Sequence, residues 1–177
     1  MNHAAEKSPA WYVVYVRNNH EAKVESYLQS QGVQAFVPWV SVPSRRKDRF
    51  KLLRVPLFDS YVFVYTDLNP KDYYTITHHQ SVVQIVGGQE GSFSLPADRI
   101  ESLRRILAHG QNVFILPGPA SGRQVRFIAG SLAGVAGKLS RRRGCKCRLA
   151  IDLEIFGKSV AVDVEVAENE IEPAVKA

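Results

Sequence analysis

Basic side chains are the residues of this sequence with the clearest potential chemistry, and they fall into two clusters. Residues 45–54 hold six Lys or Arg side chains with one acid, Asp48, and residues 138–148 hold six with no acid. An acidic segment, residues 152–172, follows the second cluster. Because clustered positive charge attracts phosphate, the two clusters predict a nucleic-acid partner, and solvated loop tips are the alternative.

The residues that could support catalysis or bind a metal do not form a recognisable site. No nucleophile elbow, phosphate-binding loop or zinc-protease motif is present, and no nucleophile is linked by sequence to His78 and His79. Cys145 and Cys147 are the two cysteines of the chain, and a zinc site needs about four ligands. We therefore expect no enzyme, no metal and no cofactor, with the histidine pair on the surface.

The elements that position the basic clusters begin with an α+β pattern. Asn18 or Asn19 is expected to cap the first helix, Gly32 to end it, and Asn69-Pro70 to start the second. The polar tip at residues 44–50 predicts a hairpin. The strands are expected at 11–16, 33–42, 52–55, 60–66 and 82–86, and the helices after 19, from 70 to 78 and from 98 to 109. This order predicts an α+β domain, residues 9–110, with a mostly antiparallel sheet flanked by helices.

The pattern changes after a segment rich in Pro and Gly. Residues 111–121 contain Pro117, Gly118 and Pro119 and predict a linker. Residues 122–174 then hold five short strands, with alternating apolar side chains at 149–155 and 160–166 and no helical periodicity. They predict a second domain that is a small β-barrel.

Several motifs together resemble one family. The glycine-rich run from Gly122 to Leu139 resembles the KOW motif of SH3-like barrels, and Leu153–Lys158 (LEIFGK) is similar to the hairpin of the NusG C-terminal domain. In the first domain Trp11–Val14, Pro56–Val64 and Val82–Gly88 resemble signatures of the NusG N-terminal domain. The resemblance covers residues 11–172, and the chain is identified as a member of the NusG/RfaH family of transcription elongation factors.

One departure from the family pattern indicates a specialised member. Asp59-Ser60 stands where the family signature usually has Pro-Gly. This variation is more similar to specialised paralogues, such as RfaH and the UpxY-type antiterminators, than to the general factor. A fold-switching C-terminal domain is not expected, because residues 122–174 lack helical periodicity.

The resemblance implies that the first domain binds the clamp helices of RNA polymerase. The implied contact is an exposed aromatic row on one strand, Tyr61, Phe63 and Tyr65, and the alternative is that this row faces the core. A second polymerase contact is expected near Asp72–Thr75. Non-template or upstream DNA would be bound near the first helix by Arg17, Asn19, His20 and Lys23, and at the hairpin tip by Arg45, Arg46, Lys47 and Arg49.

The second domain is expected to recruit a further partner. In the family this partner is a ribosomal small-subunit protein or Rho, and the matching residues are Ile155, Phe156 and Gly157, although Phe156 could instead be buried. The predicted function is transcription elongation or antitermination by a cytoplasmic monomer with no membrane contact. The alternative is a KOW-type RNA- or ribosome-binding protein. The target operons, the sign of the effect on pausing and the identity of the second partner stay open.

Overall fold

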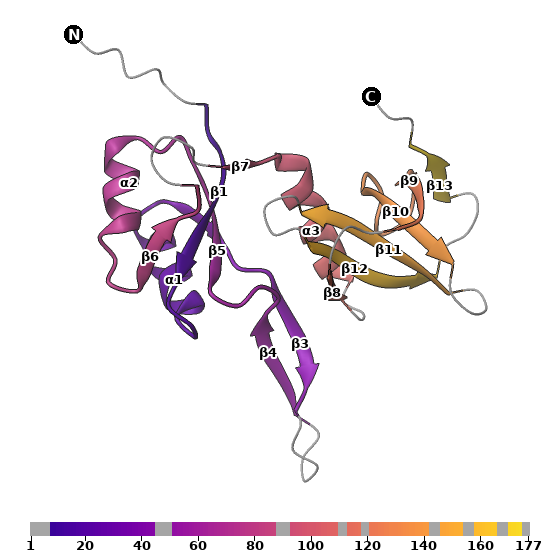
Figure 1. The fold of residues 1–177 in the computed structure, drawn as a ribbon, viewed down its shortest axis with the longest axis horizontal. Coiled ribbons are helices and arrows are strands. Elements are labelled where there is room, and N and C mark those ends of the chain that lie inside the picture. Colours follow the sequence, from indigo (N-terminus) through magenta and orange to yellow (C-terminus); the bar gives the residue numbers. More distant parts are fainter. Residues whose placement is uncertain are drawn as a thin grey trace. The chain divides into compact units, whose positions relative to one another are not determined.

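The computed structural model describes most of the chain, in eight ranges. These are residues 8–44, 51–87, 93–109, 113–117, 121–141, 146–153, 158–165 and 170–174. The chain divides into two compact units (Figure 1). Unit 1 comprises Met1–Pro38 and Pro56–Ala97, and unit 2 comprises Trp39–Val55 and Asp98–Ala177. The hairpin and the last helix belong to unit 2, and the predicted domain limits stay a prediction.

Unit 1 contains an antiparallel sheet with two helices, which confirms the α+β prediction for this part of the chain. The strands are β1 (Ala10–Val16), β2 (Gln34–Phe36), β5 (Tyr61–Thr66), β6 (Val82–Ile85) and β7 (Ser94–Leu95). Their order is β2-β5-β1-β6, and β7 also pairs with β1. The helices are α1 (Glu21–Ser30) and α2 (Pro70–Thr77).

The two helices of unit 1 start in different ways. Asn69 caps α2 as predicted, because its side chain accepts a hydrogen bond from the backbone N–H of Asp72 at 2.9 Å. The expected cap of α1 at Asn18 or Asn19 is wrong: His20 occupies that position and makes no side-chain capping bond. Asn19 instead has a φ of 62°, which lets the chain turn between β1 and α1.

The two faces of β5 can be assigned from one hydrogen bond. The Thr66 hydroxyl donates to the carboxylate of Asp72 on α2 at 2.7 Å. Because alternate residues of a strand share a face, Val62, Val64 and Thr66 form the row on the side of α2. Tyr61, Phe63 and Tyr65 therefore face the opposite side of the sheet.

Unit 2 contains a hairpin, a helix and a second antiparallel sheet. The hairpin is β3 (Trp39–Pro43) with β4 (Leu52–Pro56), and the helix is α3 (Ala97–His109). The sheet, called here the C-terminal sheet, has the order β13-β9-β10-β11-β12-β8. Its strands are β8 (Val113–Pro117), β9 (Arg123–Phe127), β10 (Ala136–Arg141), β11 (Lys146–Leu153), β12 (Lys158–Glu165) and β13 (Ile171–Pro173).

The C-terminal sheet buries one alternating apolar row, as its sequence predicted. Leu149 and Ile151 on β11 and Val160 and Val162 on β12 are all inaccessible to solvent. Gly137 lies at a close approach of β10 to the neighbouring strand β11. A Cβ at this position would stand 2.5 Å from the carbonyl oxygen of Ala150. The five predicted strands are present, and their closure into an SH3-like barrel stays a prediction.

The segment predicted as a linker contains a strand. Residues 113–117 of the expected linker 111–121 form β8, which pairs with β12 in the C-terminal sheet. The linker limits stay a prediction, and within them residues 113–117 are an ordered strand. The backbone hydrogen bonds between β8 and β12 stabilise the extended conformation of residues 113–117. This stabilisation is greater than the local tendency of the Pro- and Gly-rich sequence to form a turn.

In the described ranges, no helix is both long enough and apolar enough to cross a membrane.

Candidate functional site

The aromatic row on β5 is only partly exposed. Phe63 is 0% exposed, Tyr65 is 37% exposed and Tyr61 is half-buried. The expectation that Phe63 is an exposed contact residue is therefore wrong. Its ring lies between Phe36, at a centroid distance of 6.2 Å, and Phe58, at 6.1 Å, so neighbouring aromatic side chains cover the middle of the row.

Three tyrosines remain at the solvent on this side of the sheet. Tyr15 on β1 is 37% exposed and pairs across the ladder with Tyr61, and their rings are 5.5 Å apart. Tyr65 lies opposite Trp11 with a ring separation of 5.4 Å. Tyr15, Tyr61 and Tyr65 are called here the tyrosine face. The sequence predicted two of its members and missed Tyr15, which cross-strand register alone places beside Tyr61.

A second candidate surface lies at the loop between β1 and α1. Arg17, Asn19 and Lys23 are exposed and His20 is partly exposed. The backbone N–H of Arg17 donates to the carbonyl of Ser81 at 2.8 Å, which joins this loop to the start of β6. The structure therefore brings the four predicted residues to one end of the sheet, and they are called here the loop cluster.

Two residues that the sequence did not indicate belong to the same surface. The Tyr27 and His79 rings are 4.6 Å apart. Burial lowers the pKa of His79 below its ordinary value of 6.5, and the charges of Lys23 and His20 lower it further. Nδ1 of His79 accepts a hydrogen bond from the Ser81 N–H at 3.1 Å, which favours a neutral ring with its proton on Nε2. His79 was expected at the surface together with His78, and it is partly buried.

His20 carries a polar atom with no visible role in the fold. Its Nδ1 is buried and has no hydrogen-bond partner among the described residues. Buried polar atoms are usually paired, so an unpaired one beside exposed Arg17 and Lys23 is consistent with a surface that accepts a ligand.

The expected second polymerase contact, Asp72–Thr75, contains one strongly exposed side chain. Asp72 is engaged with Thr66 and with the Asn69 cap. Tyr74 is 60% exposed, and its ring stacks on His78 at 3.5 Å. Tyr74 on α2 and His78, directly after the helix, therefore form an exposed aromatic pair.

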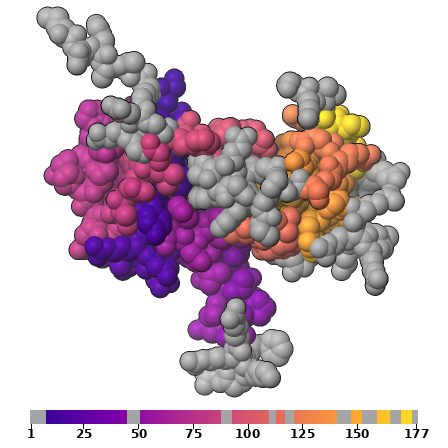
Figure 2. Space-filling view, viewed as in Figure 1, coloured from indigo at the N-terminus to yellow at the C-terminus, as the bar shows by residue number. Residues whose placement is uncertain are grey.

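The hairpin consists of the paired strands β3 and β4. The N–H of Ser44 donates to the carbonyl of Lys51 at 2.8 Å, and the Arg54 guanidinium lies 4.8 Å from the centroid of Trp39. Leu52 is 69% exposed, and the hairpin strands present open surface in the space-filling view (Figure 2). The predicted nucleic-acid contacts of the tip, Arg45, Arg46, Lys47 and Arg49, lie outside the described residues.

The predicted partner-binding residues of the second domain, Ile155, Phe156 and Gly157, also lie outside the described residues. The strands before and after them are described. Leu153 at the end of β11 pairs with Lys158 at the start of β12, in an eight-residue antiparallel register.

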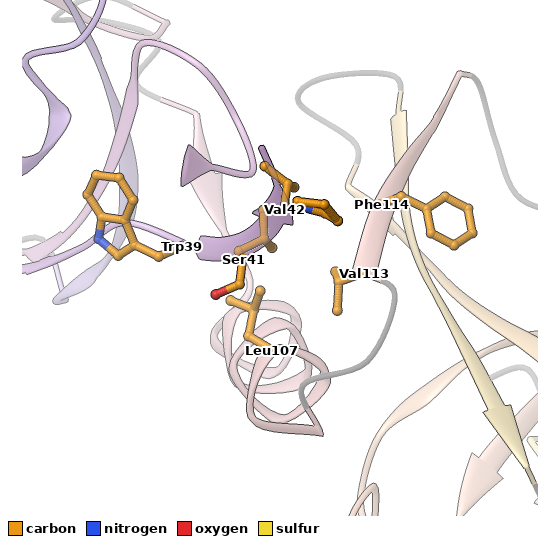
Figure 3. A pocket seen from close by; sticks show the side chains of 8 residues that line it. Trp39, Ser41, Val42, Leu107, Val113 and Phe114 are labelled. Atoms are coloured by element: carbon orange, nitrogen blue, oxygen red, sulfur yellow. The ribbon is translucent and has the colours of Figure 1, made fainter. Parts of the chain in front are cut away.

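A pocket in unit 2 offers no catalytic chemistry. It has a volume of about 330 Å³ and lies between β3, the end of α3 and β8 (Figure 3). Its lining has no acid, base or thiol, and consists of Trp39, Val40, Ser41, Val42, Pro43, Leu107, Val113 and Phe114. Within the described residues no group of His, Cys, Asp and Glu could hold a metal ion. Cys147 is a free thiol, and Cys145 lies outside those residues.

A solved structure is similar in fold to most of this chain. The solved structure titled "Domain interaction in Thermotoga maritima NusG" aligns over 94% of this chain and 97% of its own, with a TM-score of 0.53 at 20% identity. At that identity the likeness concerns the fold alone.

Sequence relatives cover nearly the full length of the chain. The transcription termination/antitermination protein NusG of Chlamydia trachomatis serovar D is 24% identical over 163 residues, which are 86% of this chain and 89% of the relative. The protein of the same name from Pseudomonas aeruginosa is 25% identical over 175 residues, 90% of this chain and 97% of the relative. The family model described as "Transcription termination factor nusG" matches residues 9–104, more than half of the chain, and the chain therefore belongs to the NusG family.

Proposed function

We propose that this chain is a transcription elongation and antitermination factor that binds RNA polymerase through the tyrosine face of unit 1. Its curated relatives are named as termination and antitermination proteins. The observation that carries the proposal is the tyrosine face itself. Three partly exposed tyrosines stand together on the side of the sheet opposite α2.

The tyrosine face has the chemistry of a protein-binding surface. Tyrosine is enriched at binding hot spots because it offers a large apolar ring together with a polar hydroxyl. The buried Phe63 lies between Tyr61 and Tyr65 on β5 and packs against Phe36 and Phe58, so the two tyrosines of β5 flank a packed aromatic residue. Rigid aromatic side chains lose little conformational entropy on binding. An apolar helix surface, such as the polymerase clamp helices implied by the family, fits a surface of this kind.

The test is the affinity of the full chain for RNA polymerase. Tyr61→Ala with Tyr65→Ala should weaken binding at least tenfold, because two truncated anchors remove more than about 1.4 kcal/mol. Ile128→Ala is the matched control, since Ile128 is an exposed apolar residue of unit 2 and is 54% exposed. Circular dichroism should show that both proteins are folded. Equal affinity of the double variant and the control would refute the proposal.

The loop cluster is proposed to bind DNA near the polymerase. Arg17 and Lys23 supply charge for phosphates, and Asn19 and His20 supply groups that hydrogen-bond to bases. A ligand phosphate beside His79 would also favour the protonated ring, so binding should take up protons. Arg17→Gln with Lys23→Gln should weaken binding of a single-stranded DNA in a transcription scaffold and reduce its salt dependence. A salt-independent interaction would contradict this role.

The hairpin tip and the second domain complete the proposal. Arg45, Arg46, Lys47 and Arg49 would add phosphate contacts to upstream DNA. Tyr74 and His78 on α2 are the groups through which the Asp72–Thr75 region would reach a second polymerase element. Ile155, Phe156 and Gly157 would bind a ribosomal small-subunit protein or Rho, as the family resemblance implies. Asp59-Ser60 supports a specialised, operon-specific role, which mapping of occupied genes would test.

A further inference from the structure

The connection between α3 and β9 is built into the C-terminal sheet. β8 pairs with β12 over five residues, from Val113 opposite Val162 to Pro117 opposite Lys158. It is the outermost strand on that side of the sheet. The edge of β12 is therefore occupied by a segment that connects one element of the chain to the next.

Two side chains of β8 pack at a defined site beside this edge. Phe114 lies opposite Ala161 and Leu116 lies opposite Ser159, and both pack against a cluster of Ala150 and Ala161. Ala161 and Ser159 are fully buried and Ala150 is 3% exposed. Small residues on β11 and β12 thus leave room for a large aromatic and a large aliphatic side chain two positions apart.

An arginine on β11, Arg148, also contacts the Phe114 ring. The Arg148 guanidinium lies 4.3 Å from the centroid of the Phe114 ring, and it makes two hydrogen bonds to Asp163, at 2.7 and 3.2 Å. In Figure 3 the Phe114 ring points away from β3. A cation fixed by a carboxylate over an aromatic face adds a directional contact to the apolar packing.

The helix before the connection is anchored to the loop between β9 and β10. The Arg105 guanidinium donates a hydrogen bond to the carbonyl of Ala133, and Nδ1 of His109 is 2.9 Å from the Ser131 hydroxyl. Gly134 fits against Arg105, since a Cβ at Gly134 would lie 2.6 Å from the arginine Nη1. The helix α3 is therefore attached to the loop between β9 and β10, and β8 is attached to β12. Residues 110–112 join α3 to β8 in the sequence.

We propose that the edge of β12 is a strand-binding site that β8 fills in cis, and that β8 is a releasable latch. With β8 in place, three residues connect α3 to the sheet and span at most about 10 Å. With β8 released, residues 110–122 form the connection and span up to about 45 Å. The open edge then accepts an extended segment of a partner protein that carries an aromatic and an aliphatic side chain two residues apart.

Amide hydrogen exchange on the isolated full chain tests the latch. In the wild-type protein the amides of β8 should exchange at least tenfold more slowly than those of an unstructured peptide of the same sequence. Phe114→Asp with Leu116→Asp should abolish this protection and expose the amides of β12 that face β8, while β10 and β11 stay protected. Ser121→Asp adds one negative charge at an exposed site of the connection and should change nothing.

A peptide of residues 112–118 supplies an independent readout. Labelled at its N-terminus, it should bind the double variant at least tenfold more tightly than the wild-type protein, whose edge is filled. The single variant Phe114→Ala should lie between the two, which keeps the test decisive if the double variant unfolds. Unprotected β8 amides in the wild-type protein, or equal peptide binding by wild type and Phe114→Ala, would overturn the proposal. No polymerase is present, so failure here is distinct from failure of the tyrosine face.

Discussion

A buried glutamate holds the turn that leads into the tyrosine face. Glu21, in the first turn of α1, is 2% exposed, and its Oε1 accepts a hydrogen bond from the Ser60 backbone N–H at 2.6 Å. Ser60 has a φ of 68°, in the left-handed region that disfavours non-glycine residues. The same turn is fixed by a second bond, from the Val16 N–H to the Ser60 carbonyl at 2.9 Å. Glu21 therefore stabilises a strained residue directly before Tyr61.

Replacing Glu21 should destabilise unit 1 by an amount that the structure allows to be estimated. A hydrogen bond to a charged group contributes about 1.5–3 kcal/mol, and a buried N–H left unpaired costs about 1–3 kcal/mol. Removal of the carboxylate also relieves the desolvation of a buried charge, which offsets part of this loss. We expect Glu21→Ala to lower the free energy of unfolding by about 3 kcal/mol. Glu21→Gln keeps an acceptor oxygen and should cost about 1 kcal/mol.

The assay is urea denaturation followed by tryptophan fluorescence. The chain has two tryptophans, Trp11 in unit 1 and Trp39 in unit 2, so a Trp39→Phe background makes the signal specific for unit 1. Ser26→Ala, at an exposed position of α1, is the control and should change the free energy by less than about 0.5 kcal/mol. A loss of less than about 1 kcal/mol in Glu21→Ala would refute the assigned role of the Glu21–Ser60 bond.

Three further predictions follow from packing and charge. Phe63→Ala should lower the free energy of unfolding of unit 1 by about 3–5 kcal/mol in the same assay, whereas Tyr65→Ala, at a partly exposed site, should cost much less. Gly137→Ala should destabilise the C-terminal sheet, measured as faster amide exchange in β10 and β11, because its Cβ would meet the Ala150 carbonyl. Since burial lowers the pKa of His79, the folded state binds fewer protons than the unfolded state just below pH 6.5. The stability of unit 1 should therefore be highest above that pH and fall as the pH drops, and denaturation of His79→Gln at several pH values should show a smaller fall.

Local sequence signals predicted most of the elements of both units. The apolar run from Trp11 to Val16, the Asn69-Pro70 start of α2 and the periodic apolar residues of α3 each specify their element without long-range partners. The cap of α1 was predicted at the wrong residue, because Asn18 and Asn19 are both good capping residues and one of them is needed for the turn at φ 62°. The Glu21–Ser60 bond joins positions 39 residues apart, and no local signal indicates it.

The candidate site shows why alternation cannot determine exposure. On β5, alternation correctly separates Tyr61, Phe63 and Tyr65 from Val62 and Val64, yet both valines and Phe63 are fully buried. β5 is a central strand of its sheet, and neighbouring side chains such as Phe36 and Phe58 cover the middle of the face that carries Phe63. Exposure therefore rises only toward the ends of the row. The pairing of β1 with β5 then adds Tyr15, which the sequence of β5 alone cannot supply.

The same reasoning applies to β8, where two local signals conflict. Val113–Leu116 is a strongly apolar run with high β-propensity, whereas the residues after it are rich in Pro and Gly and predict a loop. The strand that decides between them, β12, begins 41 residues after Pro117, at Lys158. The pairing of β8 with β12 joins residues far apart in the sequence, so it depends on the rest of the sheet being formed. The Ala150–Ala161 cluster, against which Phe114 and Leu116 pack, exists only when β11 and β12 are paired. The strand should thus be the last part of the sheet to form and the first to be lost, which is the property that a releasable latch requires.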